Sequence, residues 1–291
     1  ITVGISFAMM LLKYFNILPY VSDAVGPVFR YFGLPGSAAL AYLSGYFINV
    51  YSAMAVMSTL ALDARELTIL STMVLCSHSM ILETAVLKKT GVSGVRMIIV
   101  RTLSAIFLGW FLNLILPEGS GEVVTAAVAQ EQFTFWFTLR EWLWSTFKLV
   151  LLITVIIYIL NIVQRLLYEF GVIAMISKFL KPLMLFFGLP PKTAFLWIVA
   201  NIIGLAYGAA AMLDEIARDK LERRDVLLIN THISISHSNL EDLILLAALG
   251  AVGWIMLLIR WAMSMVLVWE LRLEFYIKDA IAKRKNRNFV V

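Results

Sequence analysis

Cysteine and charged residues are both scarce in this sequence. A single cysteine, Cys76, stands among 291 residues, which excludes an intrachain disulfide and a zinc site built from cysteines. Charged residues make up 15% of the chain and hydrophobic residues 61%, whereas soluble domains have roughly 25% charged and 45–50% apolar residues. This composition excludes an ordinary soluble domain.

Two sequence signatures of enzymes are also missing. The chain has neither a glycine-rich ATP-binding loop nor the Gly-x-Ser-x-Gly elbow of a hydrolase. We therefore expect no enzyme activity, no catalytic residue and no cofactor, and any transport would be secondary or driven by a partner. The net charge of +5 resides largely at predicted helix ends and in the tail, as in the cytoplasmic flanks of membrane proteins, and predicts no nucleic-acid binding.

Long apolar runs dominate what is present, and the mean hydropathy is +0.88. Runs of about 20 residues recur along the chain, which is the length that an α-helix needs to cross the hydrocarbon core of a bilayer. The sequence thus predicts an all-α integral membrane protein with the lipid bilayer as its surroundings. The predicted spans are residues 2–21, 66–88, 94–116, 145–168, 226–248 and 251–275.

The second half of the sequence repeats the first. FGLPGSAALAY at 32–42 resembles FGLPPKTAFLW at 187–197, an offset of 155 residues. Farther along the offset becomes 159, where Ser77-His78-Ser79 matches Ser236-His237-Ser238, Glu83 matches Asp242, and Arg101 matches Arg260. Such matches are informative because leucine matches alone would arise by chance in so apolar a chain. We divide the chain into repeat unit 1 (1–117), an external linker (118–143), repeat unit 2 (144–276) and a basic cytoplasmic tail (277–291).

Each unit also contains two segments that differ from ordinary spans. Residues 22–33 and 174–188 are amphipathic and contain a proline, which favours a helix lying at the membrane interface. Residues 36–60 and 191–214 are apolar but rich in Gly, Ala and Ser. Either could be one crossing helix, but we prefer a re-entrant helical hairpin with its tip at mid-depth.

The distribution of charge favours hairpins that do not cross. Each unit then has three spans, and the two units are inverted relative to each other. The basic tail, the basic loop 218–224 and Lys88–Lys89 fall on the cytoplasmic side, while the acidic segment 117–141 falls outside, which is the positive-inside pattern. We therefore predict a multi-pass cell-membrane protein with an inverted repeat and a cytoplasmic C-terminus.

Polar side chains interrupt two of the predicted spans at matching depths. Ionisable groups in a membrane are costly and usually functional, so we predict a substrate-binding site where both interruptions meet the hairpin tips. Its candidate residues are Ser77, His78, Ser79, Glu83, Ser236, His237, Ser238, Asn239, Glu241 and Asp242, with Asn49 and Asn201 from the tips. The alternative is that these side chains only bond neighbouring helices, and we assign that structural role to His232.

The Gly-Leu-Pro entry to each hairpin, the interfacial helix before it and the polar break in the next span resemble the GATE, or nucleoside-recognition, domain family. The layout is similar to the core of concentrative nucleoside transporters, to the permease part of ferrous-iron transporters and to spore-maturation membrane proteins. The resemblance covers nearly the whole chain and implies a transporter-like fold. The tips, GYFINVYS and ANIIGLAYG, lack a Gln-Thr-Glu cluster for nucleoside contact.

Three functional classes follow from these observations. The first is a secondary transporter that binds a small polar solute, with a nucleoside as one candidate and H⁺ or Na⁺ as the driving ion. The second is a path for a divalent metal such as ferrous iron, because histidines and carboxylates are suitable ligands, although the sequence alone assigns no metal ligand. The third is a non-transporting membrane module that acts with a partner. With only six spans we also expect a homo-oligomer.

Overall fold

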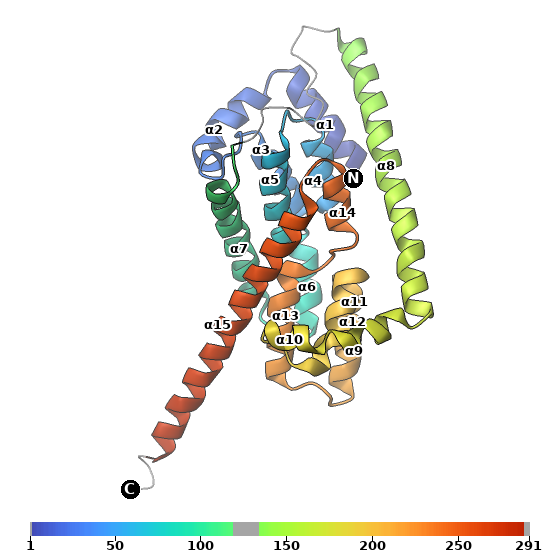
Figure 1. The fold of residues 1–291 in the computed structure, drawn as a ribbon. Helices are drawn as coiled ribbons and strands as arrows, with labels where there is room; N and C mark the ends of the chain where they lie inside the picture. Colours follow the sequence, from blue (N-terminus) through green and yellow to red (C-terminus); the bar gives the residue numbers. More distant parts are fainter. Residues whose placement is uncertain (1, 119–133, 288–291) are drawn as a thin grey trace.

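The computed structural model describes residues 2–118 and 134–287 and is helical throughout its regular elements, with no strand in these two ranges (Figure 1). The first half contains α1 (Thr2–Tyr14), α2 (Leu18–Arg30), α3 (Ala38–Phe47), α4 (Val50–Met57), α5 (Ala64–Ser77), α6 (Met80–Lys89) and α7 (Gly94–Ile115). The second half contains α8 (Phe135–Glu169), α9 (Val172–Phe179), α10 (Lys181–Phe186), a 3₁₀ turn (Pro191–Thr193), α11 (Ala194–Ile202), α12 (Leu205–Ala217), α13 (Arg223–Ser236), α14 (Asp242–Ala248) and α15 (Gly253–Arg287).

The protein is a helical membrane protein, and within the described residues four helical stretches are long and apolar enough to span a bilayer. They are Ala64–Lys89, Gly94–Ile115, Phe135–Glu169 and Gly253–Lys283. The 22 residues of α7 extend about 33 Å at 1.5 Å per residue, close to the thickness of the hydrocarbon core. A fifth span results if the bent pair of α1 and α2 is taken as one.

Several predicted boundaries need correction. The predicted span 2–21 is divided, because α1 ends at Tyr14 and α2 begins at Leu18 after a bend of 97°. Asn16 adopts a left-handed backbone and Pro19 stands in the first turn of α2, a position that suits proline. The predicted span 226–248 is interrupted between α13 and α14.

The ends of the long helices α8 and α15 also differ from the prediction. α8 begins at Phe135, so part of the predicted linker 118–143 is helical, while residues 119–133 lie outside the described ranges. α15 continues to Arg287, so most of the predicted tail 277–291 extends the last span as one helix. The two segments predicted to lie at the interface form short helices, α2 in the first half and α9 with α10 in the second.

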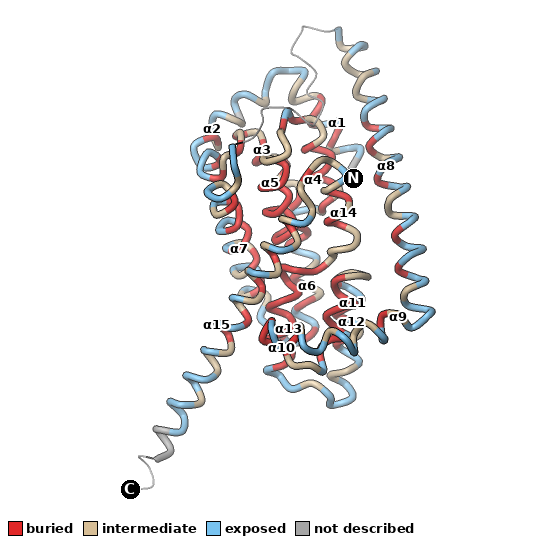
Figure 2. The backbone as a smooth tube through the Cα atoms, viewed as in Figure 1, coloured by how far each residue is buried: buried red, intermediate tan, exposed pale blue. Residues whose placement is uncertain are grey.

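The helices pack around two apolar cores, one at each end of the molecule. The upper core of Figure 1 holds the hairpin helices α3 and α4, with Met54, Leu70 and Leu112 among its buried residues. The lower core holds α11 and α12, with Trp197 and Met212 among its buried residues. Figure 2 shows these inner helices largely buried, whereas α8 and α15 alternate between buried and exposed positions.

Two long helices connect these cores in opposite directions. α7 begins in the lower core at Met97 and reaches the upper core at Leu112. α15 begins in the upper core at Met256 and reaches the lower core at Leu271. The helix pairs α5–α6 and α13–α14 also run between the two cores in opposite directions. Leu87 of α6 lies in the lower core, whereas the leucines of α14 lie in the upper core. Each core is therefore completed by elements of the other half.

Small residues let the two helices of each hairpin approach closely. Gly45 of α3 faces Ala53 of α4, and at the corresponding positions Ala200 of α11 faces Gly208 of α12. A Cβ atom added to Gly208 would lie 2.7 Å from the Cβ of Ala200 and 3.0 Å from its Cα. Close backbone contact between helices inside a membrane depends on small residues at such positions.

We expect Gly208→Ala to lower the free energy of unfolding by about 1–3 kcal/mol, because α11 and α12 must separate to admit one methyl group. Thermal denaturation of the protein in detergent measures this. Gly4→Ala is the matched control, since an added Cβ there meets nothing within 4 Å. Adding Ala200→Gly to Gly208→Ala should recover part of the loss, and equal stability of Gly208→Ala and Gly4→Ala would refute the close contact.

Candidate functional site

The two polar interruptions have nearly the same backbone geometry. α5 ends at Ser77, His78 is extended, and Ser79 is left-handed with φ 48°. α13 ends at Ser236, His237 is extended, and Ser238 is left-handed with φ 54°. Each break leaves carbonyl groups at a helix end without partners inside the helix, and these groups need donors from elsewhere when no water reaches them.

Two buried arginines donate to these carbonyl groups. Arg101 of α7 donates from Nε to the Cys76 carbonyl at 3.0 Å and from Nη2 to the His78 carbonyl at 2.7 Å. Arg260 of α15 donates from Nε to the Ile235 carbonyl at 2.8 Å and from Nη2 to the His237 carbonyl at 2.7 Å. Both arginines are fully buried. Each break is therefore held by the long helix that follows it in the same half.

The hairpin tips supply the remaining backbone contacts. The Ser79 amide donates to the Gly45 carbonyl at 2.9 Å, and the Ser238 amide donates to the Ala200 carbonyl at 3.2 Å. Asn239 adds a second contact, because its amide donates to the Asn201 carbonyl at 2.9 Å. Each break is therefore hydrogen-bonded to the hairpin of its own half.

Four side chains from the two breaks meet in one cluster, which we call the central cluster: His78, Glu83, His237 and Asp242. His78 Nε2 lies 3.1 Å from Glu83 Oε1 and 3.2 Å from Asp242 Oδ2. His237 Nε2 lies 3.2 Å from the same Glu83 oxygen, and the two imidazole rings are 5.2 Å apart between centroids. Glu83 Oε2 pairs with Arg101 Nη2 at 2.6 Å. The cluster joins the two halves of the chain.

The central cluster is nearly closed to solvent. His237 is fully buried and His78 is 3% exposed, while the side chains of Glu83 and Asp242 are 14% and 10% exposed. Ionisable groups at such burial need charged or hydrogen-bonding partners. The donor atoms of His78, Glu83 and His237 lie within 4.8 Å of one another, which is close enough for one metal ion to contact all three.

A second group of polar side chains borders the cluster. Tyr51, just after the first hairpin tip, donates its hydroxyl to Glu241 at 2.5 Å. Asn239 accepts from Arg260 Nη1 at 3.0 Å and donates to the Asn201 side chain at 2.5 Å. Glu241, Asn239 and Asn201 were predicted site residues, and the structure places them beside the central cluster.

Other predicted site residues make local bonds instead. Asn49 caps α4, since its side chain accepts from the Ser52 amide at 2.9 Å and from the Ser52 hydroxyl at 2.8 Å. The Ser77 hydroxyl donates to Tyr42, and Ser236 contacts His232. Ser79 and Ser238 contribute backbone amides, as described above. The described side-chain hydrogen bonds of Asn49, Ser77 and Ser236 are made outside the central cluster.

Sequence reasoning missed Tyr51 and did not assign the arginines to the site. Tyr51 has no counterpart in the second half, where the repeat offset leads to Ala206, so the repeat gave no signal for it. Arg101 and Arg260 were visible as a matched pair, but their contacts with carbonyl groups depend on how α7 and α15 pack. His232 lies outside the cluster, accepting a hydrogen bond from Trp197 at 3.2 Å, in agreement with its expected structural role.

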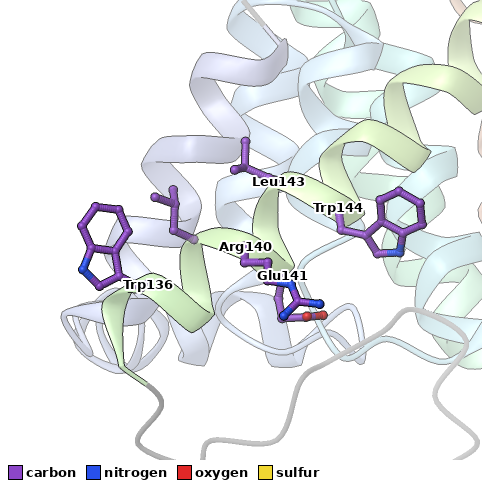
Figure 3. Close-up of a pocket in the computed structure, with 6 residues that line it drawn as sticks. Trp136, Arg140, Glu141, Leu143 and Trp144 are labelled. Atoms are coloured by element: carbon purple, nitrogen blue, oxygen red, sulfur yellow. The ribbon is translucent and has the colours of Figure 1, made fainter.

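A hollow elsewhere on the protein lies at the start of α8, and all of its lining residues belong to that helix. Figure 3 shows Trp136 and Trp144 at opposite ends of this stretch of the helix, with Arg140 and Glu141 between them. Both tryptophans are well exposed. Tryptophans at a helix end are typical anchors at the boundary between membrane and water, so we interpret this region as a membrane boundary.

The comparisons with known proteins agree with this architecture. Residues 1–94 match the Gate family, described as nucleoside recognition. The first third of the chain is thus similar to the Gate family, and the resemblance predicted from the hairpin entry and the polar break is confirmed over these residues. The uncharacterized membrane protein YvoD of Bacillus subtilis (strain 168) is 28% identical over 261 residues, which cover 88% of this chain and 83% of that protein. No solved structure matches the chain.

Proposed function

We propose that this Gate-domain membrane protein is a secondary carrier in which two inverted units bind a small polar solute or ion at the central cluster. The observation that carries the proposal is the cluster itself, since Glu83 from one unit contacts His237 from the other at 3.2 Å. A buried ionisable site at the junction of two repeats is the usual binding position in secondary transporters. We propose neither an enzyme activity nor a catalytic residue.

The opposite directions of α7 and α15 support the inverted arrangement. Corresponding helices of parallel repeats would run the same way through the membrane, whereas these two leave opposite cores and end in opposite cores. The breaks in α5–α6 and α13–α14 then approach the cluster from opposite faces of the membrane. This geometry gives each face its own hairpin and its own half of the site.

The hairpins fit the re-entrant role. α3 and α4 contain 10 and 8 residues, which extend about 15 and 12 Å, or roughly half of the hydrocarbon core. Both helices contribute buried residues to the upper core, and both α11 and α12 contribute to the lower core. We infer that neither hairpin crosses the membrane and that their tips meet the breaks at mid-depth.

The charged loops support the proposal that the lower end of the molecule in Figure 1 faces the cytoplasm. Arg224 in the first turn of α13 pairs with Asp279 in the last part of α15, so the basic segment 218–224 and the C-terminal part of α15 lie at the same end. Basic residues concentrate on the cytoplasmic side of membrane proteins. We propose that the C-terminus is cytoplasmic. The homo-oligomer stays a prediction, as does the nucleoside as solute.

Alternating access to the central cluster can be measured with Leu240→Cys. Leu240 lies in the break between α13 and α14, next to Asn239, and is partly exposed. A carrier opens its site to each face in turn, so we expect a small membrane-impermeant thiol reagent to modify this cysteine in both right-side-out and inside-out vesicles. Slower labelling with uridine or adenosine present would identify the solute as nucleoside-like.

The unmodified protein is the matched control, because Cys76 is its only cysteine and is fully buried. It should remain unlabelled from both sides. Labelling of Leu240→Cys from one side only, or from neither side, would contradict alternating access. That result would favour a non-transporting membrane module.

A further inference from the structure

We propose that the central cluster is a binding site for one divalent first-row transition-metal ion, with His78 Nε2, His237 Nε2 and Glu83 Oε1 as its ligands. This inference deepens the proposed function, on which it rests for the role of the site, because it names the class of ligand that the site takes. The main evidence for the metal site is the pattern of hydrogen bonds made by the two imidazole rings.

The other nitrogen of each ring identifies its tautomer. His78 Nδ1 lies 3.2 Å from the Val74 carbonyl, and His237 Nδ1 lies 2.8 Å from the Ile233 carbonyl. A carbonyl oxygen can only accept a hydrogen bond, so each Nδ1 must carry the hydrogen. In a neutral imidazole the Nε2 atom then presents a lone pair. Metal-binding histidines are commonly fixed in this way, by a bond from the second nitrogen to a backbone carbonyl.

Both Nε2 atoms lie close to the same acceptor. His78 Nε2 and His237 Nε2 approach Glu83 Oε1 at 3.1 and 3.2 Å, and an ionised carboxylate has no hydrogen to donate. The other oxygen of Glu83 is engaged by Arg101. Three acceptor atoms at hydrogen-bond distance repel one another unless something positive lies among them.

One metal ion satisfies this arrangement with a single cation in place of two separate protons. Protons would have to occupy both Nε2 positions to give two hydrogen bonds to Glu83. Two imidazolium rings 5.2 Å apart between centroids would then lie in a buried site beside the guanidinium of Arg101. A single cation contacts both nitrogens and the carboxylate at once.

The spacing of the donor atoms fits a tetrahedral ion. Metal–nitrogen and metal–oxygen bonds of about 2.0–2.2 Å place neighbouring ligand atoms about 3.3–3.6 Å apart in a tetrahedron. The two Nε2 atoms lie 3.1 and 3.2 Å from Glu83 Oε1, and all three atoms lie within 4.8 Å of one another. The three side chains can therefore supply three of the four ligands of a tetrahedral ion.

The donor set and the charges define the class of ion. Imidazole and carboxylate ligands suit Zn²⁺, Fe²⁺ and Co²⁺, while Ca²⁺ and Mg²⁺ prefer oxygen ligands alone. The charged side chains described around the cluster are the carboxylates of Glu83, Glu241 and Asp242 and the guanidinium groups of Arg101 and Arg260. Three negative groups exceed two positive groups by one, so a cation is also the favoured charge.

Cobalt binding to the purified full-length protein tests the proposal directly. Protein in detergent is stripped of metal with a chelator and titrated with Co²⁺ while its visible absorption is recorded. We expect one equivalent to bind and to give the intense absorption of tetrahedral Co²⁺, and one equivalent of Zn²⁺ to remove it. No binding, or only the weak absorption of octahedral Co²⁺, would overturn the proposal.

The three histidines of the chain provide matched variants. His78→Ala, His237→Ala and Glu83→Gln should each weaken Co²⁺ binding by at least about tenfold, whereas His232→Ala should bind as the unmodified protein does. Equal loss in His232→Ala and His78→Ala would contradict the ligand assignment. If an alanine variant fails to fold, Glu83→Gln and the spectrum of the unmodified protein still decide the question.

The result of the cobalt titration can be distinguished from the result of the Leu240→Cys labelling experiment. Metal binding without alternating labelling of Leu240→Cys would leave a structural metal site and refute the carrier. Alternating labelling without metal binding would leave the carrier and refute the metal.

Discussion

Arg101→Met is expected to leave little folded protein in the membrane. The substitution removes the donors to the buried Cys76 and His78 carbonyl groups and the partner of Glu83, whose side chain is 14% exposed. Removing one partner of a buried ion pair costs about 3–5 kcal/mol, because the other charge stays buried without compensation. Methionine keeps much of the side-chain length, so the loss would reflect the missing donors.

The equivalent substitution in the second half should be milder. Arg260 donates to two carbonyl groups and to Asn239, and the described contacts pair it with no carboxylate. Arg260→Met therefore leaves acceptors without donors but no unpaired acid. We expect a loss of stability for Arg260→Met that lies between those of Arg101→Met and the control.

The measurement is the monodisperse fraction after detergent extraction together with the thermal midpoint of that fraction. Arg165→Met is the control, because Arg165 is 78% exposed and its one ion pair among the described residues is with Glu169 four residues away, an interaction of at most about 1 kcal/mol. If Arg101→Met extracts and melts like Arg165→Met, the breaks do not depend on the buried guanidinium groups.

Much of the helical order could be predicted from local sequence patterns. Apolar length predicted α7 almost to the residue, and the matched Ser-His-Ser segments located both breaks. The capping boxes Asp63–Glu66 and Glu222–Asp225 show why the broken helices begin where they do, since each pair satisfies the first amide groups of its helix. Such features depend only on residues close in the chain.

The contacts of the site were less predictable because they depend on how distant helices pack. The pairing of Glu83 with His237 crosses 154 residues, and that of Tyr51 with Glu241 crosses 190. Symmetry predicts equal roles for Glu83 and Asp242, yet Glu83 contacts both histidines and Arg101, while Asp242 contacts only His78 among the described ion pairs. The two halves have diverged in side-chain detail while keeping the backbone breaks.

The beginning of α8 illustrates another limit. Polar residues such as Arg140 and Glu141 suggested a linker, but they belong to the first turns of a 35-residue helix. A helix that leaves the hydrocarbon core can continue with polar residues, so composition marks the membrane boundary and not the helix end. The same reasoning explains why α15 continues past the predicted tail boundary at 277.

The largest qualitative difference that we predict is the side of the membrane on which two corresponding loops lie, because the two units are expected to have opposite orientations. The loop before α5 and the loop before α13 hold corresponding positions of the repeat. Ala61 and Lys220 are exposed residues of these loops, and Arg65 and Arg224 follow them at matching positions. Parallel units would place both loops on one face of the membrane, whereas inverted units place them on opposite faces.

Side-specific labelling of these two loops is the most direct test of the inverted architecture on which the central site depends. Ala61→Cys and Lys220→Cys are made separately in a Cys76→Ala background and exposed to a membrane-impermeant maleimide in intact cells and after permeabilisation. We expect Ala61→Cys to react in intact cells, and Lys220→Cys to react only after permeabilisation. Reaction of both cysteines from the same side would contradict the inverted repeat.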